Sequence, residues 1–336
     1  MPGIQNGLPP CVPPSWARNG HLQTILGNYL PSPQCARPST RLRVELPDGD
    51  ALAGRAFEGS SDVLVLVFHG LGGDATAHYV QRTTELAQQR SHSVWTMNHR
   101  GCGEGRGLAR GTYHSGRGDD LGAVFAEARR RYPGKRLLAI GFSLSGNALL
   151  FNLGKHAWAE PDFAISVNPP VNLERSAILI KTGLNRLYDL RFVKRCRTAV
   201  RERHVDGLIP DHYLTRWSMT LHDFDNAYTA PASGFRDRED YYATCSAGPV
   251  LARITKPTVI LTAKDDPFVP WQDHFEAAKA DCVHLHLEEV GGHMGYLSQN
   301  LPGRRWLDLA LGHYMDRLLV APEPLETRPS PPEKLA

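Results

Sequence analysis

The spacing of hydrophobic and polar positions along the chain changes at Val63. Upstream, residues 40–46 and 51–57 alternate apolar with polar side chains around the turn Pro47-Asp48-Gly49-Asp50, which predicts an antiparallel hairpin. From Val63 to Phe68 every residue is apolar, as is typical of a strand that is buried on both faces. The chain therefore passes from a half-exposed hairpin into a sheet that is covered on two sides.

Five further apolar runs follow, with helical patterns between most of them. The runs are residues 93–97, 137–140, 163–167, 258–262 and 283–287, and the helical patterns are residues 77–89, 120–132, 146–156 and 306–318. Strands that alternate with helices predict right-handed βαβ units and a mostly parallel central sheet with helices on both faces. The expected fold class is α/β.

One long interval interrupts this alternation. From residue 172 to about 250 the chain is polar and largely helical, without a buried-strand run. We expect a helical cap insertion at 172–250, over the carboxyl ends of the strands, between two parts of an α/β core at 40–171 and 251–320. Residues 1–39 are expected to form an N-terminal extension packed on the core, and residues 321–336, rich in proline and charge, a flexible tail.

Composition narrows the functional classes. Of 336 residues, 41% are hydrophobic, which suffices for a sizeable core, and a net charge of +3 is too weak to indicate nucleic-acid binding. The six cysteines form no CxxC pair and are interpreted as reduced thiols. Residues 1–14 lack a signal-peptide pattern, and no apolar stretch reaches the roughly 18 residues of a membrane span. We expect a cytoplasmic protein without an integral membrane segment.

A candidate nucleophile lies between the strand at 137–140 and the helix that follows. The segment Gly141-Phe142-Ser143-Leu144-Ser145-Gly146 resembles the GxSxG turn, which needs very small residues two before and two after its serine. Gly141 meets the first need, whereas Ser145 stands where the motif has glycine. A helix N-terminus beside the hydroxyl can stabilise developing negative charge. The pattern predicts Ser143 as a nucleophile, with a plain small-residue turn as the alternative.

A serine nucleophile needs a base that is oriented by a carboxylate, in the chain order serine, acid, histidine. Asp265 and Asp266 follow the strand at 258–262, and Asp266 is favoured because its spacing to Val269-Pro270 matches an acid-x-x-Val-Pro pattern. The strand after it leads to Gly291-Gly292-His293, where the glycines suit a loop that returns the imidazole over the sheet. We predict Asp266 and His293 as partners of Ser143, with Asp265 as the alternative acid.

Other polar segments follow the predicted strands. His69-Gly70-Leu71-Gly72-Gly73 predicts an oxyanion hole made by the amides of Leu71 and Leu144, and no Lys-Ser/Thr follows it as a phosphate loop requires. The polar residues 113–116 with Asp119-Asp120 are interpreted as helix capping. No metal and no cofactor is expected.

Residues 186–203 form a basic amphipathic pattern. Its cations are Arg186, Arg191, Lys194, Arg195, Arg197, Arg201 and Arg203. Such a helix can contact anionic lipid or an acidic substrate, although a solvated face above a core face is the commoner case.

Several blocks together resemble the YheT-like α/β-hydrolases, a group of bacterial esterases and related mammalian lipid hydrolases. Asn19-Gly20-His21-Leu22-Gln23-Thr24 is similar to that family's Asn-Pro-His-Leu-Gln-Thr signature. The other similar blocks are residues 69–73, 98–102, 113–116, 141–147, 224–231, 234–235, 240–242, 265–268 and 291–293. The resemblance runs from about residue 19 to 314 and implies an α/β-hydrolase fold.

By this resemblance Ser143, Asp266 and His293 occupy the family's triad positions. The chain departs from the family pattern at Gly20, usually proline, at His99, usually phenylalanine, and at Ser145, usually glycine. The expected function is hydrolysis of carboxylic esters, with short- to medium-chain acyl or lipid-like substrates. Alternatives are acyl transfer, thioester or amide cleavage on the same residues, and a non-catalytic scaffold that binds a small ligand.

Overall fold

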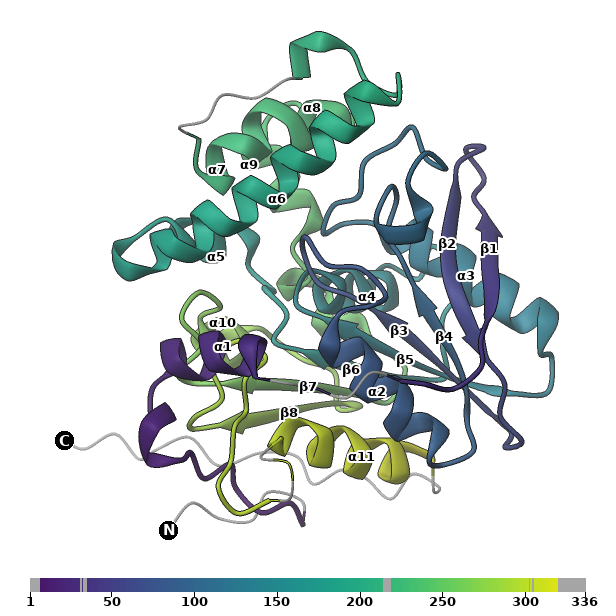
Figure 1. Cartoon of the computed structure of the whole chain (residues 1–336), viewed down its shortest axis with the longest axis vertical. Helices are drawn as coiled ribbons and strands as arrows, with labels where there is room; N and C mark the ends of the chain where they lie inside the picture. The colour runs from purple at the N-terminus through teal and green to yellow at the C-terminus, as the bar shows by residue number, and fades with distance from the viewer. Residues whose placement is uncertain are drawn as a thin grey trace.

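The predicted hairpin and the six buried runs form one eight-stranded sheet. The computed structural model describes residues 7–30, 32, 35–213, 219–301, 303 and 305–319. The strand order is β1-β2-β4-β3-β5-β6-β7-β8 (Figure 1). The strands are β1 (Thr40–Glu45), β2 (Ala51–Phe57), β3 (Val63–Phe68), β4 (Ser93–Met97), β5 (Arg136–Phe142), β6 (Phe163–Val167), β7 (Thr258–Ala263) and β8 (Val283–Glu288). Strand β2 runs antiparallel to both of its neighbours, β1 and β4, and all other neighbouring pairs are parallel, which confirms the α/β fold class.

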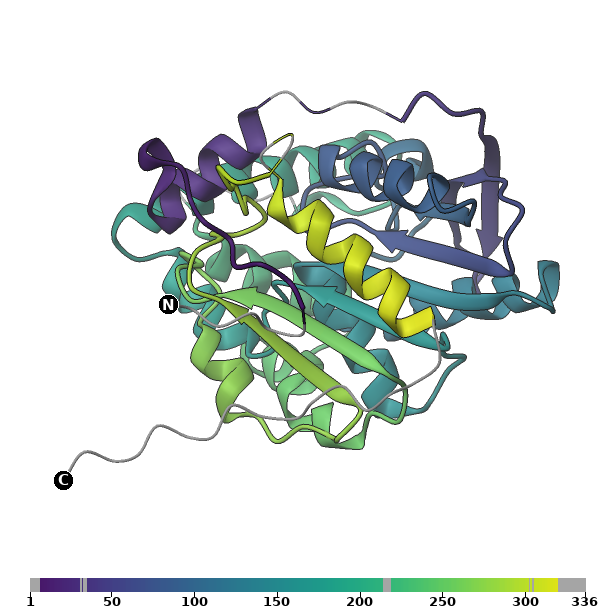
Figure 2. The same ribbon diagram turned by 90° about the horizontal axis from the view of Figure 1, so that it is seen from below.

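Helices cover both faces of the sheet. The helices α3 (Gly118–Arg131) and α4 (Leu144–Lys155) contact each other over one face, and α2 (His78–Gln88) and α11 (Trp306–Leu319) contact each other over the opposite one (Figure 2). Along β3, Leu64 and Leu66 join the core cluster that includes α3 and α4, whereas Val63 and Val65 join the cluster with α2 and α11. Successive side chains of a strand point to opposite faces, so two buried faces require an unbroken apolar run.

The interval between β6 and β7 is helical. Its α- and π-helices are α5 (Leu173–Ile180), α6 (Arg186–Val205), α7 (Leu221–Phe224), a π-helix (Asp225–Thr229), α8 (Ala230–Ala232) and α9 (Arg238–Cys245), and short 3-10 helices lie at Gly183–Asn185, Asp211–Tyr213 and Gly248–Arg253. In the parts of this interval that the structure describes, there is no strand. These helices lie beyond one end of the sheet (Figure 1), where β5 leads into Ser143. The boundaries of a separate cap domain stay a prediction.

The segment before the sheet packs against the last part of the chain. Helix α1 (Gly20–Tyr29) starts at Asn19, whose side chain accepts a hydrogen bond from the Leu22 amide (2.9 Å). Gln23 binds both the amide and the carbonyl of Leu297, at 2.6 and 3.1 Å. The purple and yellow segments accordingly lie together in Figure 2. The predicted tail, 321–336, lies outside the described residues. Among the described helices, none has both the length and the apolar character needed to cross a membrane.

Candidate active site

Ser143 lies on a sharp turn between β5 and α4. Its backbone angles are φ 53° and ψ −117°, which L-residues with a side chain rarely adopt. A Cβ atom on Gly141 would lie 2.5 Å from the Ser145 carbonyl oxygen, so the turn admits no side chain there. The Ser143 amide donates to the Val167 carbonyl (2.8 Å) and anchors the turn to β6. The strained geometry presents the hydroxyl at the N-terminus of α4.

The structure brings the three predicted residues together. The Ser143 Oγ lies 2.9 Å from His293 Nε2, and His293 Nδ1 lies 2.7 Å from an Asp266 carboxylate oxygen. Asp266 and His293 are both buried, and Ser143 borders a cavity. Serine, imidazole and carboxylate therefore form one hydrogen-bonded chain, with the Nδ1 proton on His293 facing the carboxylate.

Asn168, which the sequence analysis did not single out, holds the Asp266 carboxylate. Its side-chain amide donates to Asp266 Oδ2 (2.6 Å) and to the Gly292 carbonyl (3.1 Å), and its oxygen accepts from the Tyr296 hydroxyl (2.7 Å). Asn168 has φ 47°, a left-handed conformation that asparagine tolerates better than most residues. An asparagine directly after a buried strand and before Pro169-Pro170 is the signal that could have identified it.

Asp265, the alternative acid, binds the backbone of the loop that carries His293 and not the His293 ring. Its carboxylate accepts hydrogen bonds from the amides of Gly291 and Gly292, both at 2.8 Å. Burial raises the pKa of this carboxyl group. A Cβ atom on Gly20, where the family usually has proline, would lie 1.6 Å from the Asp265 carbonyl oxygen. The start of α1 therefore packs directly on the loop that carries Asp265.

Helix α1 also reaches the histidine loop. The Thr24 hydroxyl accepts a hydrogen bond from the His293 amide (2.8 Å) and donates to the Gly20 carbonyl (2.7 Å). The signature segment at 19–24 thus supports the base from outside the sheet, a contact that its distance along the chain conceals.

The loop after β3 uses most of its amides internally. The Gly70 amide donates to the Tyr79 hydroxyl (2.8 Å), the Gly72 amide to the Tyr113 hydroxyl (3.0 Å), and the Gly73 amide to the Gly70 carbonyl (3.2 Å). Among the described residues, the turn and loop hydrogen bonds give the Leu71 amide no acceptor. Leu144 is the first residue of α4, where amides lack helical partners. These two amides remain our prediction for an oxyanion hole.

Ser145 is accommodated by a buried polar contact. Its hydroxyl donates to the His69 carbonyl and lies 2.5 Å from His99 Nε2. The His99 amide in turn donates to His69 Nε2 (3.2 Å), and the His99 ring stacks on Tyr113 at 5.3 Å. Burial lowers the pKa of His99 well below its usual value and also lowers that of His69, which favours the neutral form of both rings. The network joins the nucleophile turn to the loop after β3.

The capping interpretation of residues 113–120 is wrong. The N-cap of α3 is Arg117, which makes no side-chain capping bond. Asp120 instead binds the Arg100 guanidinium at 2.6–3.1 Å, where Asp50 also binds it at 2.6 Å. A buried cation without a paired anion is strongly destabilising, whereas water can satisfy an exposed helix end. Asp120 therefore pairs with Arg100 and does not cap the helix.

Two cavities meet at Ser143. The larger, about 550 Å³, lies between the sheet and α6, with a mostly apolar lining that includes Leu144 and Phe192. The smaller, about 320 Å³, is bordered by α1 and includes Ile25 and His293. Leu71, Phe192 and Ser143 border both, whereas His293 borders the smaller one alone. Both volumes fall in the range of small-molecule sites, roughly 300–1,000 Å³.

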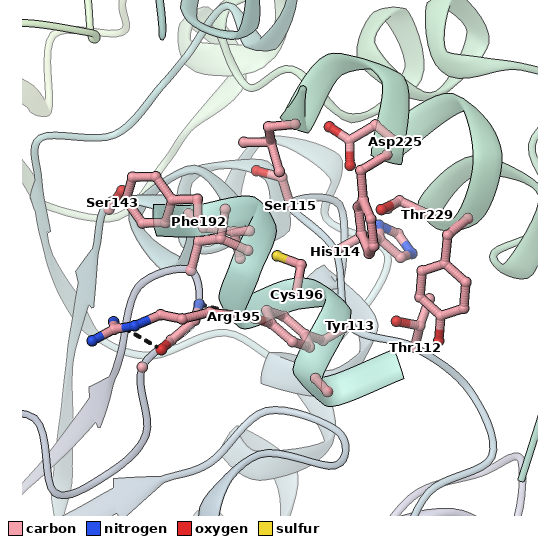
Figure 3. Close-up of a pocket in the computed structure, with 18 of the residues that line it drawn as sticks. Thr112, Tyr113, His114, Ser115, Ser143, Phe192, Arg195, Cys196, Asp225 and Thr229 are labelled. Atoms are coloured by element: carbon pink, nitrogen blue, oxygen red, sulfur yellow. Dashed lines mark hydrogen bonds between the residues drawn. The ribbon is translucent and has the colours of Figure 1, made fainter. Parts of the chain in front are cut away.

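A carboxyl group borders the larger cavity far from the nucleophile. Figure 3 shows Ser143 on one side of this cavity and Asp225 and Thr229 on the other. The Asp225 carboxylate accepts a hydrogen bond from the Tyr242 hydroxyl (2.8 Å), and burial raises its pKa to about 6. The apolar space therefore ends at a titratable group.

Comparisons with known proteins agree with this architecture. A sequence model described as "Alpha/beta hydrolase family" matches residues 64–302. "Putative esterase YheT" of Escherichia coli (strain K12) is 32% identical over 92% of this chain and 94% of its own length. "Phospholipase ABHD3" of Homo sapiens is 26% identical over 91% and 76%, and "Monoacylglycerol lipase" of Saccharomyces cerevisiae is 28% identical over 72% and 56%.

Solved structures share the fold at lower sequence identity. The Pyrococcus furiosus esterase Pf2001 superposes with a TM-score of 0.58 at 16% identity, covering 85% of this chain and 99% of its own. At this identity the likeness concerns the fold alone.

Proposed function

Since the chain belongs to the alpha/beta hydrolase family, as an esterase- or lipase-type member, we propose that it cleaves carboxylic esters through an acyl-serine intermediate on Ser143. The observation that carries this proposal is the hydrogen-bonded chain from Ser143 through His293 to Asp266. Ser143, at one end of this hydrogen-bonded chain, borders two cavities of ligand size.

The first half-reaction forms the acyl-serine. His293 Nε2 takes the proton of the Ser143 hydroxyl as the oxygen attacks the ester carbonyl carbon. The amides of Leu71 and Leu144 bind the oxyanion, a donor pair of which each member is worth about 3 kcal/mol in comparable enzymes. The imidazolium then gives its proton to the departing alkoxide as the carbonyl–oxygen bond breaks, and Asp266 stabilises the imidazolium through Nδ1.

Water completes the cycle by the same steps in reverse order. It loses a proton to His293 Nε2 as it attacks the acyl carbon, and the Ser143 oxygen leaves with that proton.

The position of His293 supports one assignment of the two cavities to the two parts of the ester. Its Nε2 must protonate the leaving oxygen, and His293 borders the smaller cavity but not the larger one. The alcohol part of the ester therefore belongs in the smaller cavity, beside α1. The acyl part belongs in the larger, mostly apolar cavity, which suits a short- to medium-chain or lipid-like acyl group. A small-molecule or lipid ester is thus the substrate class, and a cytoplasmic location stays a prediction.

The experiment compares Ser143→Ala with the wild type on p-nitrophenyl esters. Removal of the hydroxyl leaves no atom to carry the acyl group, so kcat is expected to fall roughly 10⁴-fold or more. The control Ser298→Ala removes a buried hydroxyl on a loop that binds Val12 and should keep its activity. Full turnover by Ser143→Ala would disprove the proposal.

Two alternatives use the same geometry differently. Acyl transfer, or attack on a thioester or amide, would give new products when alcohols and amines compete with water. A non-catalytic scaffold would leave Ser143 unlabelled by a fluorophosphonate probe in the folded protein. The aligned hydrogen bonds of Ser143, His293 and Asp266 favour a catalytic role over the scaffold, and the competition experiment separates hydrolysis from the other reactions.

A further inference from the structure

Two helices at the edge of the smaller cavity lie side by side. The His21 ring of α1 stacks on the Tyr188 ring of α6 at 5.8 Å with an interplanar angle of 5°. Arg191 Nη1 donates to the Tyr29 hydroxyl (2.8 Å), with its guanidinium 5.3 Å above that ring. Helix α1 and the first half of α6 therefore share one surface, which borders the smaller cavity at Ile25, Tyr29 and Arg191.

This surface exposes large apolar side chains. Leu184, Leu187 and Leu190 are 70%, 67% and 55% exposed, and Tyr29 is 68% exposed. Leu187 lies three residues before Leu190 and four before Arg191, spacings that put all three on one side of α6, and Leu184 lies in the 3-10 turn (Gly183–Asn185) that leads into this helix. Exposed apolar residues that gather in this way mark an interaction surface, whereas scattered ones do not. We define the docking face as Leu22, Ile25, Tyr29, Leu184, Leu187 and Leu190.

The charges in the sequence around the docking face are mostly positive, although one of the cations, Arg175, is paired with Asp273 and Glu276. Residues 175–201 contain eight lysines and arginines but a single acidic residue, Asp189, which is buried and accepts a hydrogen bond from the Leu221 amide. Residues 15–30 contain Arg18 and no acidic residue. A helix face that meets only water usually mixes both signs. Here the exposed leucines of α6 lie in a segment whose exposed charges are cations, among them Arg186 and Lys194.

We propose that the docking face binds a lipid surface with anionic headgroups and so turns the mouth of the smaller cavity toward the lipid. Apolar side chains of an interfacial helix enter the boundary between headgroups and acyl chains, and Lys and Arg are attracted to anionic lipid. The exposed leucines fit the first requirement and the cations of α6 the second. This inference goes beyond the proposed function, because binding to a surface requires no ester cleavage.

The test uses Ser143→Ala protein, so that hydrolysis cannot alter the vesicles. It is sedimented with phosphatidylglycerol vesicles and with phosphatidylcholine vesicles. We expect binding to the anionic vesicles at least about tenfold tighter than to the neutral ones, with a further loss at about 0.5 M salt. Leu184→Asp/Leu187→Asp in this background should abolish binding. Val205→Asp, at the other end of α6 and 77% exposed, should preserve it.

Failure to bind the anionic vesicles, or binding that survives Leu184→Asp/Leu187→Asp, would overturn the proposal. A second copy of the chain on this face would appear as a dimer in light scattering that the same double substitution converts to a monomer, which would also overturn it. With Ser143 intact, Leu184→Asp/Leu187→Asp should hydrolyse a soluble short-chain ester within about twofold of the wild type. That measurement separates lost docking from lost folding or catalysis.

Discussion

The hydroxyl of Ser145 lies 2.5 Å from Nε2 of His99, in the buried space behind the nucleophile turn. Both residues are departures from the pattern of the YheT-like hydrolases that the chain resembles, in which position 145 is usually glycine and position 99 usually phenylalanine. The two departures meet in one contact, where His99 supplies the donor that a buried serine oxygen needs. Ser145 and His99 are thus a single structural unit that compensates for the missing glycine.

We predict that the effects of Ser145→Gly and His99→Phe on the free energy of unfolding do not add. Ser145→Gly removes a hydrogen-bonding partner of the His99 ring and of the His69 carbonyl, which should cost about 1–3 kcal/mol in the free energy of unfolding. The double substitution should cost less than the sum of the single ones by about 1 kcal/mol or more. Denaturant unfolding measures the difference. Ser298→Gly combined with His99→Phe is the control pair, and its changes in the free energy of unfolding should add. If the changes for Ser145→Gly and His99→Phe also add, the two residues do not act together.

The backbone strain at Ser143 predicts that a glycine at this position stabilises the fold although it removes the nucleophile. Glycine adopts φ 53° and ψ −117° without the steric cost that serine bears there. Ser143→Gly should therefore be inactive yet more stable than Ser143→Ala by about 1 kcal/mol, after allowance for the greater chain entropy of unfolded glycine. Thermal unfolding of the two variants tests this. Equal unfolding temperatures for the two variants would show that the backbone at Ser143 is not strained.

Substitution of Asp266 should lower kcat far more than substitution of Asp265. Asp266→Asn leaves His293 Nδ1 facing an amide, so kcat should fall roughly 10³–10⁴-fold, as when such a carboxylate is lost elsewhere. Asp265→Asn keeps an oxygen that can accept from the Gly291 and Gly292 amides, and its kcat should change less than about tenfold. Steady-state kinetics of both variants distinguish them. A larger loss for Asp265→Asn would reverse the assignment of the acid.

Asp225 should make stability depend on pH. Its folded pKa, about 6, exceeds the ordinary value of an aspartate, so the folded state holds this proton more tightly than the unfolded chain. Its contribution is most favourable below about pH 4 and is lost as the pH rises to about 6, by on the order of 2 kcal/mol. Asp225→Asn should therefore raise the unfolding temperature at pH 8 but not at pH 4. An equal increase at both pH values would contradict this.

The assignment of the cavities predicts opposite specificity changes. Ala199→Phe reduces the larger cavity and should shift the preference toward shorter acyl chains while the alcohol preference stays constant. Ile25→Trp reduces the smaller cavity and should penalise bulky alcohols. Because the alcohol has left before water attacks, Ile25→Trp should not slow the release of a preformed acyl-enzyme. Single-turnover measurements with two ester series check both, and an effect of Ile25→Trp on acyl-chain preference would reverse the assignment.

The sequence predicts the sheet well because burial on two faces leaves an unbroken apolar run, as in β3 and β7. It also indicates Ser143 and His293, since each follows a buried strand in the expected order. Asn168 and Thr24 were missed because their importance lies in contacts between segments far apart in the chain. Asp120 was misinterpreted for the same reason. Its partner Arg100 belongs to another loop, and local patterns report only neighbours along the chain.

The smaller cavity has a consequence for the fate of the acyl group. Once the alcohol departs, the space beside His293 is open to whichever nucleophile arrives next. Water and a second alcohol would compete for that space under the same base. In the proposed mechanism, the ratio of acid to new ester therefore depends on how well the side chains of α1 that border this cavity hold an alcohol in competition with water.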